Sequence, residues 1–198
     1  MKKTLALCVV FLSGILAVAD HLPANLLAKG KPETTLAGIS LTHDNPAEVL
    51  KRLGAPTKKI TVPNNPQWTG YLWDTPDSRL EVEVSKGKSR DFLDSITVVR
   101  LRNGSTSPKA TANESTGRGL KLGDSIDQLT MLYGSKFQVS KQAKVPVDTD
   151  PFLSVPGSET AVVQWAQMEF TLTAGLDEQG KIIALRLSPP ECYPGGCK

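Results

Sequence analysis

Residues 119–134, Gly-Leu-Lys-Leu-Gly-Asp-Ser-Ile-Asp-Gln-Leu-Thr-Met-Leu-Tyr-Gly, repeat the pattern of residues 38–54, Gly-Ile-Ser-Leu-Thr-His-Asp-Asn-Pro-Ala-Glu-Val-Leu-Lys-Arg-Leu-Gly. Each stretch opens with glycine, an apolar residue, any residue and leucine, passes a polar cap and a short amphipathic segment, and ends at glycine. Aligning Asn45 with Ser125 matches both caps and both terminal glycines at one offset of 80 residues. A repeat of that length is too long for a solenoid unit and predicts a duplicated small domain.

The two stretches predict two short helices. Their N-cap, capping-box partner and terminal glycine are Asn45, Glu48 and Gly54 in the first stretch, and Ser125, Gln128 and Gly134 in the second. Apolar residues at helical spacing form one stripe on each helix: Val49, Leu50 and Leu53, then Ile126, Leu129, Leu132 and Tyr133. Helices of about ten residues are marginal alone, so we expect each to pack on a sheet.

Strand-like segments follow each helix: 68–73, 79–84 and 93–101 after the first, and 161–165, 168–174 and 181–187 after the second. In 79–84, apolar side chains alternate with Arg79, Glu81 and Glu83, which predicts one buried and one wet face. Turn residues at 75–78 and 177–180 favour antiparallel neighbours. We therefore predict an α+β fold of two repeats, each a short helix packed on a small antiparallel β-sheet meander.

The N-terminus predicts export. A basic start, an apolar run over 5–16 and Ala-x-Ala at 17–19 are typical of a signal peptide, residues 1–19. Loss of Lys2 and Lys3 with it lowers the formal charge from +3 to +1, which gives no support for binding nucleic acid or anionic membranes. We expect a periplasmic or extracellular product without a membrane span. The predicted units are a mobile lead-in (20–37), a first α+β repeat (38–101), a polar linker (102–118), a second repeat (119–188) and a C-terminal tail (189–198).

Cys192 and Cys197 are the cysteines that remain after cleavage of the leader. A cysteine pair in an exported chain is most simply a disulfide, and the prolines and glycines around it suit a tight loop. A redox pair is the alternative, although the spacing is not Cys-x-x-Cys. A metal site has less support, because the two cysteines lack partner ligands close by in the sequence.

The order of these features resembles the superfamily of β-lactamase inhibitory protein and the SmpA/OmlA outer-membrane assembly lipoproteins. The residues that carry the resemblance are Gly119, Leu122, Gly123, Ser125, Leu129, Tyr133, Gly134, Trp165, Phe170, Leu172, Asp177, Gly180, Lys181 and Ile182. Residues 38–54 match more loosely, because Thr42-His43-Asp44-Asn45-Pro46 replaces Leu-Gly-Asp-Ser. The resemblance covers most of 38–188 and implies a tandem unit with a concave sheet surface that binds other proteins without catalysis.

The sequence contains no serine-hydrolase elbow, zinc-protease motif, P-loop or dinucleotide fingerprint. His43 beside Asp44 leaves a secreted hydrolase as an alternative, and a structural envelope protein without a discrete ligand as another. We predict no cofactor and no metal site. Tyr71 and Trp73 share one face of a predicted strand, and Phe152 lies in a long loop, so these three are the candidate contacts for a protein partner. The main expectation is an exported, non-catalytic module that binds another periplasmic or extracellular protein, in the manner of an inhibitor or an envelope-assembly factor.

Overall fold

The computed structural model describes residues 28, 31–62, 65–101, 114–141, 159–165 and 168–189. In chain order its elements are β1 (Thr35–Leu36), β2 (Ile39–Ser40), α1 (Pro46–Leu53), β3 (Lys58–Val62), β4 (Asn65–Asp74), β5 (Ser78–Lys86), β6 (Asp91–Arg100), α2 (Ile126–Tyr133), β7 (Gln138–Lys141), β8 (Glu159–Trp165), β9 (Met168–Leu176) and β10 (Ile182–Ser188).

Eight of the strands form one antiparallel sheet in the order β3-β4-β5-β6-β10-β9-β8-β7. Its two halves are meanders, β3 to β6 and β7 to β10, each joined by successive antiparallel pairs. The halves meet where β6 pairs with β10, with Val98 opposite Leu185 and Ile96 opposite Leu187. β1 and β2 form a separate two-stranded sheet.

The predicted α+β class of two helix-on-sheet repeats is therefore wrong. The structure is mostly β, and a single eight-stranded sheet replaces the two small sheets that we expected. The physical reason is that β6 and β10, the last strands of the two meanders, pair with each other. The two helices have eight residues each, so they are minor elements beside strands of up to ten residues.

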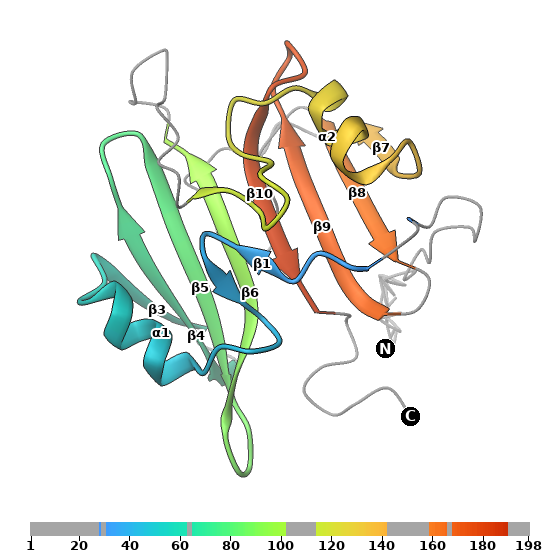
Figure 1. Ribbon diagram of the computed structural model, residues 1–198. Helices are drawn as coiled ribbons and strands as arrows, with labels where there is room; N and C mark the ends of the chain where they lie inside the picture. The colour runs from blue at the N-terminus through green and yellow to red at the C-terminus, as the bar shows by residue number, and fades with distance from the viewer. Residues whose placement is uncertain are drawn as a thin grey trace, which may run out of the picture.

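One face of the sheet carries the main hydrophobic core. Figure 1 shows α1, α2 and β1 on the same side of the large sheet, with β1 between the helices. Val49 of α1, Leu129 of α2 and Leu36 of β1 are all buried in this core. Under the C-terminal end of α2, the Tyr133 ring meets the Trp165 ring of β8 edge to face, with the ring centroids 6.0 Å apart. The helices are thus held by apolar contact with the sheet, since helices this short are not stable alone.

The helix ends predicted from the sequence are confirmed. The Asn45 side chain accepts a hydrogen bond from Ala47 N at 2.9 Å, and the Ser125 side chain accepts one from Gln128 N at 3.4 Å. Gly54 and Gly134 end the helices at φ of 76° and 81°, a left-handed backbone that favours glycine. The backbone N–H of each glycine donates to a carbonyl in the last turn, Leu50 O and Thr130 O respectively.

The second face of the sheet differs from the prediction. Alternation in β5 does place Glu81 and Glu83 opposite Thr97 and Ser95 on one face, but that face is not wet. Glu81 is 0% exposed and Glu83 is 2% exposed. The pattern correctly predicted which side chains share a face, and the expectation of solvent on that face was wrong.

Several predictions fall on residues outside the described ranges: the signal peptide, Phe152, and the disulfide between Cys192 and Cys197. Of the predicted lead-in, residues 28 and 31–37 are described, and they include the buried Ala28 and β1 with its fully buried Leu36. In the described part of the chain, neither helix is long and apolar enough to cross a membrane.

Candidate functional site

Tyr71 and Trp73 lie two residues apart on β4 and point to the same face of the sheet as the core. Their ring centroids are 6.4 Å apart and their planes are tilted by 30°. Both side chains are half-buried, because part of each ring packs against the core cluster and part reaches solvent. The structure therefore brings these two predicted contact residues together as one pair of neighbouring rings.

Two contacts fix the orientation of these rings. The Trp73 indole N–H donates to the carbonyl of Gly54, the residue that ends α1, at 3.2 Å. Lys59 stands opposite Tyr71 in the β3–β4 register, and its ammonium lies 5.4 Å from the centroid of the Tyr71 ring. A cation over an aromatic face is attracted to the ring by about 0.5–1 kcal/mol at exposed sites. We call Lys59, Tyr71 and Trp73 the aromatic patch.

The surroundings of the aromatic patch are basic. Lys51 in the last turn of α1 is exposed, as is Lys59 on β3. Lys58 is exposed too, but it stands opposite Leu72 and so points to the other face of the sheet. None of these three lysines makes an ion pair within the described ranges. Arg52, in the same last turn of α1 as Lys51, is already neutralised, since it pairs with Asp44 at 3.1 Å. The patch thus combines rigid rings with unpaired positive charge.

No hydrogen bond or ion pair joins His43 to Asp44 in the described part of the chain. One oxygen of the Asp44 carboxylate accepts the backbone N–H of Ser40 at 2.9 Å and also binds Arg52, which ties the loop before α1 to the helix. His43 is exposed on that loop. These contacts give Asp44 a structural role in holding the loop. Among the described residues, no group of three or more His, Cys, Asp or Glu side chains is placed to hold a metal ion.

Sequence reasoning missed a buried polar network beside α2. The Glu33 carboxylate is 5% exposed and accepts hydrogen bonds from the backbone N–H groups of Thr34 and Thr35. It also accepts one from the Tyr133 hydroxyl at 2.8 Å, and the Thr116 hydroxyl lies 2.7 Å from the same Tyr133 oxygen. Burial raises the pKa of Tyr133 well above its usual range. Tyr133 was recognised only as part of an apolar stripe, and nothing in the segments around Glu33 and Thr116 signals the network.

A second polar cluster lies on the buried polar face, where the two meanders meet. Glu83 Oε2 accepts from the Ser95 hydroxyl at 2.6 Å and from Arg186 Nη2 at 2.9 Å. The ion pair spans β5, β6 and β10, because Ser95 lies opposite Glu83 and Arg186 lies opposite Thr97. Burial raises the pKa of the neighbouring Asp94 to about 6, while the Ser85 hydroxyl lowers it and the charge of Glu83 raises it further.

The remote structural likenesses of this chain to solved proteins include the two that follow. The sequence matches no known family model and no curated protein. A cysteine-rich secretory protein from Staphylococcus aureus aligns at a TM-score of 0.44 and 11% identity, over 83% of this chain and 50% of that one. A DUF4309 family protein from Bacillus subtilis aligns at a TM-score of 0.41 and 14% identity, over 77% and 82% respectively. This chain therefore spans half the length of the staphylococcal protein, and neither likeness is close enough to assign a family.

Proposed function

We propose that this chain is an exported, non-catalytic module that binds another protein, and that the aromatic patch is its contact surface. The observation that carries the proposal is the pair of half-buried rings on β4, held by Gly54 and Lys59 at the end of the sheet. Rigid aromatic side chains with one face anchored and one face exposed are the usual energetic centres of protein interfaces. The resemblance of residues 38–188 to a superfamily of protein-binding domains supports the same proposal.

The charge around the patch indicates the kind of partner. Lys51 and Lys59 are exposed and without ion pairs in the described part of the chain. Complementary charge across an interface steers the encounter and disfavours partners of like charge. The partner is therefore a protein with an acidic surface in the periplasm or outside the cell.

The test is affinity capture from periplasmic and culture-supernatant fractions with the tagged chain 20–198, followed by mass spectrometry. Lys59→Glu reverses the charge over the Tyr71 ring without removing core packing, so it should weaken capture of the partner by tenfold or more, about 1.4 kcal/mol. Lys141→Glu is the matched control, because Lys141 is an exposed lysine on β7 at the opposite end of the sheet.

A double change, Tyr71→Ala with Trp73→Ala, should abolish capture altogether. Both rings also touch the core, so its fold must be checked by circular dichroism before its binding is interpreted. Failure of this variant to fold would assign the rings to the core and contradict their role as contacts. The proposal is also wrong if wild type captures no partner, if Lys59→Glu binds as well as wild type, or if the purified protein has an activity that His43→Ala removes.

A further inference from the structure

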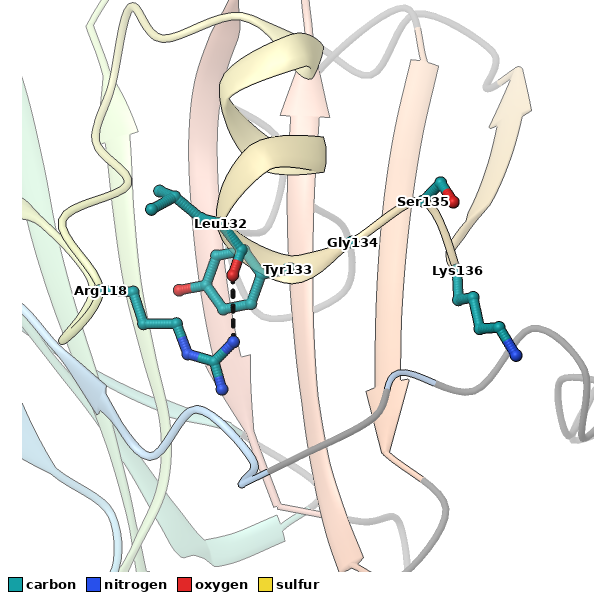
Figure 2. Close-up of a pocket in the computed structure, with 6 residues that line it drawn as sticks. All are labelled: Arg118, Leu132, Tyr133, Gly134, Ser135 and Lys136. Carbon is teal, nitrogen blue, oxygen red and sulfur yellow. Dashed lines mark hydrogen bonds between the residues drawn. The ribbon is translucent and has the colours of Figure 1, made fainter.

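A cavity of about 440 Å³ opens beside the C-terminal end of α2, at the far end of the molecule from the aromatic patch. Arg118, Leu132, Tyr133, Gly134, Ser135 and Lys136 line it (Figure 2). The volume is in the range of sites for small organic ligands, roughly 300–1,000 Å³. The function proposed above makes no use of this cavity.

The Arg118 guanidinium is held in one orientation inside the cavity. Its Nη1 donates to Leu132 O at 3.1 Å, and its Nη2 donates to Lys31 O at 2.5 Å. The guanidinium carbon lies 4.9 Å from the centroid of the Tyr133 ring, so the plane of the group is fixed by an aromatic neighbour as well. A guanidinium has five N–H donors, which leaves three of them on Arg118 for a ligand. A fork fixed in advance loses little entropy when it binds a carboxylate or phosphate.

The charge of the cavity is positive. Lys136 extends from the other side of the Gly134 turn, as Figure 2 shows, so two cationic side chains flank the space. No carboxylate belongs to its described lining. Glu33, which contacts Tyr133, is buried and already accepts hydrogen bonds from Thr34 N, Thr35 N, Arg118 N and the Tyr133 hydroxyl. Its carboxylate makes no ion pair with the Arg118 guanidinium, which keeps its charge available.

We propose that this cavity binds the anionic oxygen group of a small organic acid, a carboxylate or a phosphate ester. The remaining Arg118 N–H donors form the paired hydrogen bonds to two oxygens of the group, and Lys136 adds a second positive charge. Leu132 and the Tyr133 ring provide an apolar surface for the body of the ligand. An acid with an aromatic or branched aliphatic body is therefore preferred over a bare ion.

The proposal is tested by nuclear magnetic resonance titration of the ¹⁵N-labelled protein with benzoate, phenyl phosphate and neutral benzyl alcohol. Saturable shifts are expected at the amides of Gly134, Ser135 and Lys136 with benzoate or phenyl phosphate, and none with benzyl alcohol. The two anions decide whether the site prefers a carboxylate or a phosphate. The absence of saturable shifts with both anions up to about 20 mM, far above a millimolar dissociation constant, would overturn the proposal.

Two variants tie the binding to the two cations. Arg118→Lys keeps the charge but removes the planar fork, and should raise the dissociation constant about tenfold. Lys136→Met removes the charge of a half-buried side chain that makes no hydrogen bond or ion pair within the described part of the chain, so the fold should stay intact. It should weaken binding about threefold to fivefold at low salt. Lys141→Met is the matched control on β7 and should bind as wild type does. Equal affinities in wild type, Arg118→Lys and Lys136→Met would show that the anion binds elsewhere.

Discussion

At the scale of single residues, the buried Tyr133 hydroxyl makes the sharpest test of the polar network. It joins Glu33 to Thr116, and those residues are only 5% and 3% exposed. Tyr133→Phe would leave the Glu33 carboxylate with one donor fewer in a site that water does not reach freely. A lost partner of a buried charged group costs about 1–3 kcal/mol. We expect urea denaturation to show a loss of that size.

The control for Tyr133→Phe is Tyr71→Phe. The Tyr71 hydroxyl makes no hydrogen bond within the described part of the chain, so its removal should change the free energy of unfolding by less than about 0.5 kcal/mol. If the two substitutions change the free energy of unfolding equally, the hydrogen bonds of the Tyr133 hydroxyl do not stabilise the fold.

Asp94 predicts a specific dependence of stability on pH. Its pKa is about 6 in the folded protein against the ordinary value of 3.8, so between these values the folded state binds more protons than the unfolded state. Stability must then fall as the pH rises from about 4 to about 6, and level off above it. Asp94→Asn keeps the site neutral, and should stabilise the protein on the order of 1–2 kcal/mol at pH 7.5.

That gain should shrink as the pH is lowered to 4.5, because the wild-type carboxyl is then itself protonated. Thermal or urea unfolding at both pH values measures the difference. Asp91→Asn, an exposed change on the same strand, should show no such dependence. A gain for Asp94→Asn that is equal at the two pH values would contradict the raised pKa.

At the scale of elements, the helix caps test how far local sequence determines stability. The Asn45 cap is short, at 2.9 Å, whereas the Ser125 cap is long, at 3.4 Å. Loss of an N-cap costs about 0.5–2 kcal/mol. We therefore expect Asn45→Ala to lower the free energy of unfolding, measured by urea denaturation, more than Ser125→Ala does. Ser135→Ala, an exposed serine beyond the end of α2, is the control and should be neutral. If Ser125→Ala lowered the free energy of unfolding more, the length of the cap hydrogen bond would not determine how much each cap stabilises its helix.

The helices and the long strands were predictable because their signals are local. Caps, terminal glycines and alternation lie within a few residues of the element that they determine, and the turns at 75–78 and 177–180 are confirmed by the Thr75–Ser78 and Asp177–Gly180 hydrogen bonds. β3 and β7 were missed for the opposite reason. Both are edge strands, and all four residues of β7 are exposed, so no buried face imprints a period on the sequence.

The candidate site was predictable only in part, for the same reason. Alternation placed Tyr71 and Trp73 on one face of β4, whereas their anchors, Gly54 and Lys59, are set by contacts between elements. The cavity beside α2 could not be predicted at all. It depends on the Arg118 side chain reaching the carbonyls of Leu132 and Lys31, and Lys31 is 87 positions away in the chain. Alternation likewise cannot say what covers a sheet face, as buried Glu81 and Glu83 show.

At the scale of the whole molecule, the decisive contact is the β6–β10 pairing, which the sequence did not reveal. Every residue from 93 to 99 in β6 is buried, as expected for a strand covered on both faces in the middle of a sheet. Central strands of different halves can pair in several ways that local patterns do not distinguish. Here the Glu83–Arg186 ion pair crosses β6 and links the two meanders a second time.

A continuous sheet predicts that the two halves unfold as one cooperative unit. The three tryptophans report on both halves, since Trp68 and Trp73 lie on β4 and Trp165 lies on β8. In Trp165→Phe the fluorescence follows the first meander, and in the double variant Trp68→Phe, Trp73→Phe it follows the second. Within each variant, urea unfolding followed by fluorescence should coincide with unfolding followed by far-ultraviolet circular dichroism. A fluorescence midpoint that departs from the circular dichroism midpoint in either variant would show that the meanders are separate units.

Arg186→Met breaks the ion pair across β6 and leaves Glu83 buried. It should therefore lower both midpoints together, and the free energy of unfolding should fall by about 3–5 kcal/mol at most. A shift confined to the fluorescence of Trp165 would instead confine the effect of Arg186 to its own half of the sheet.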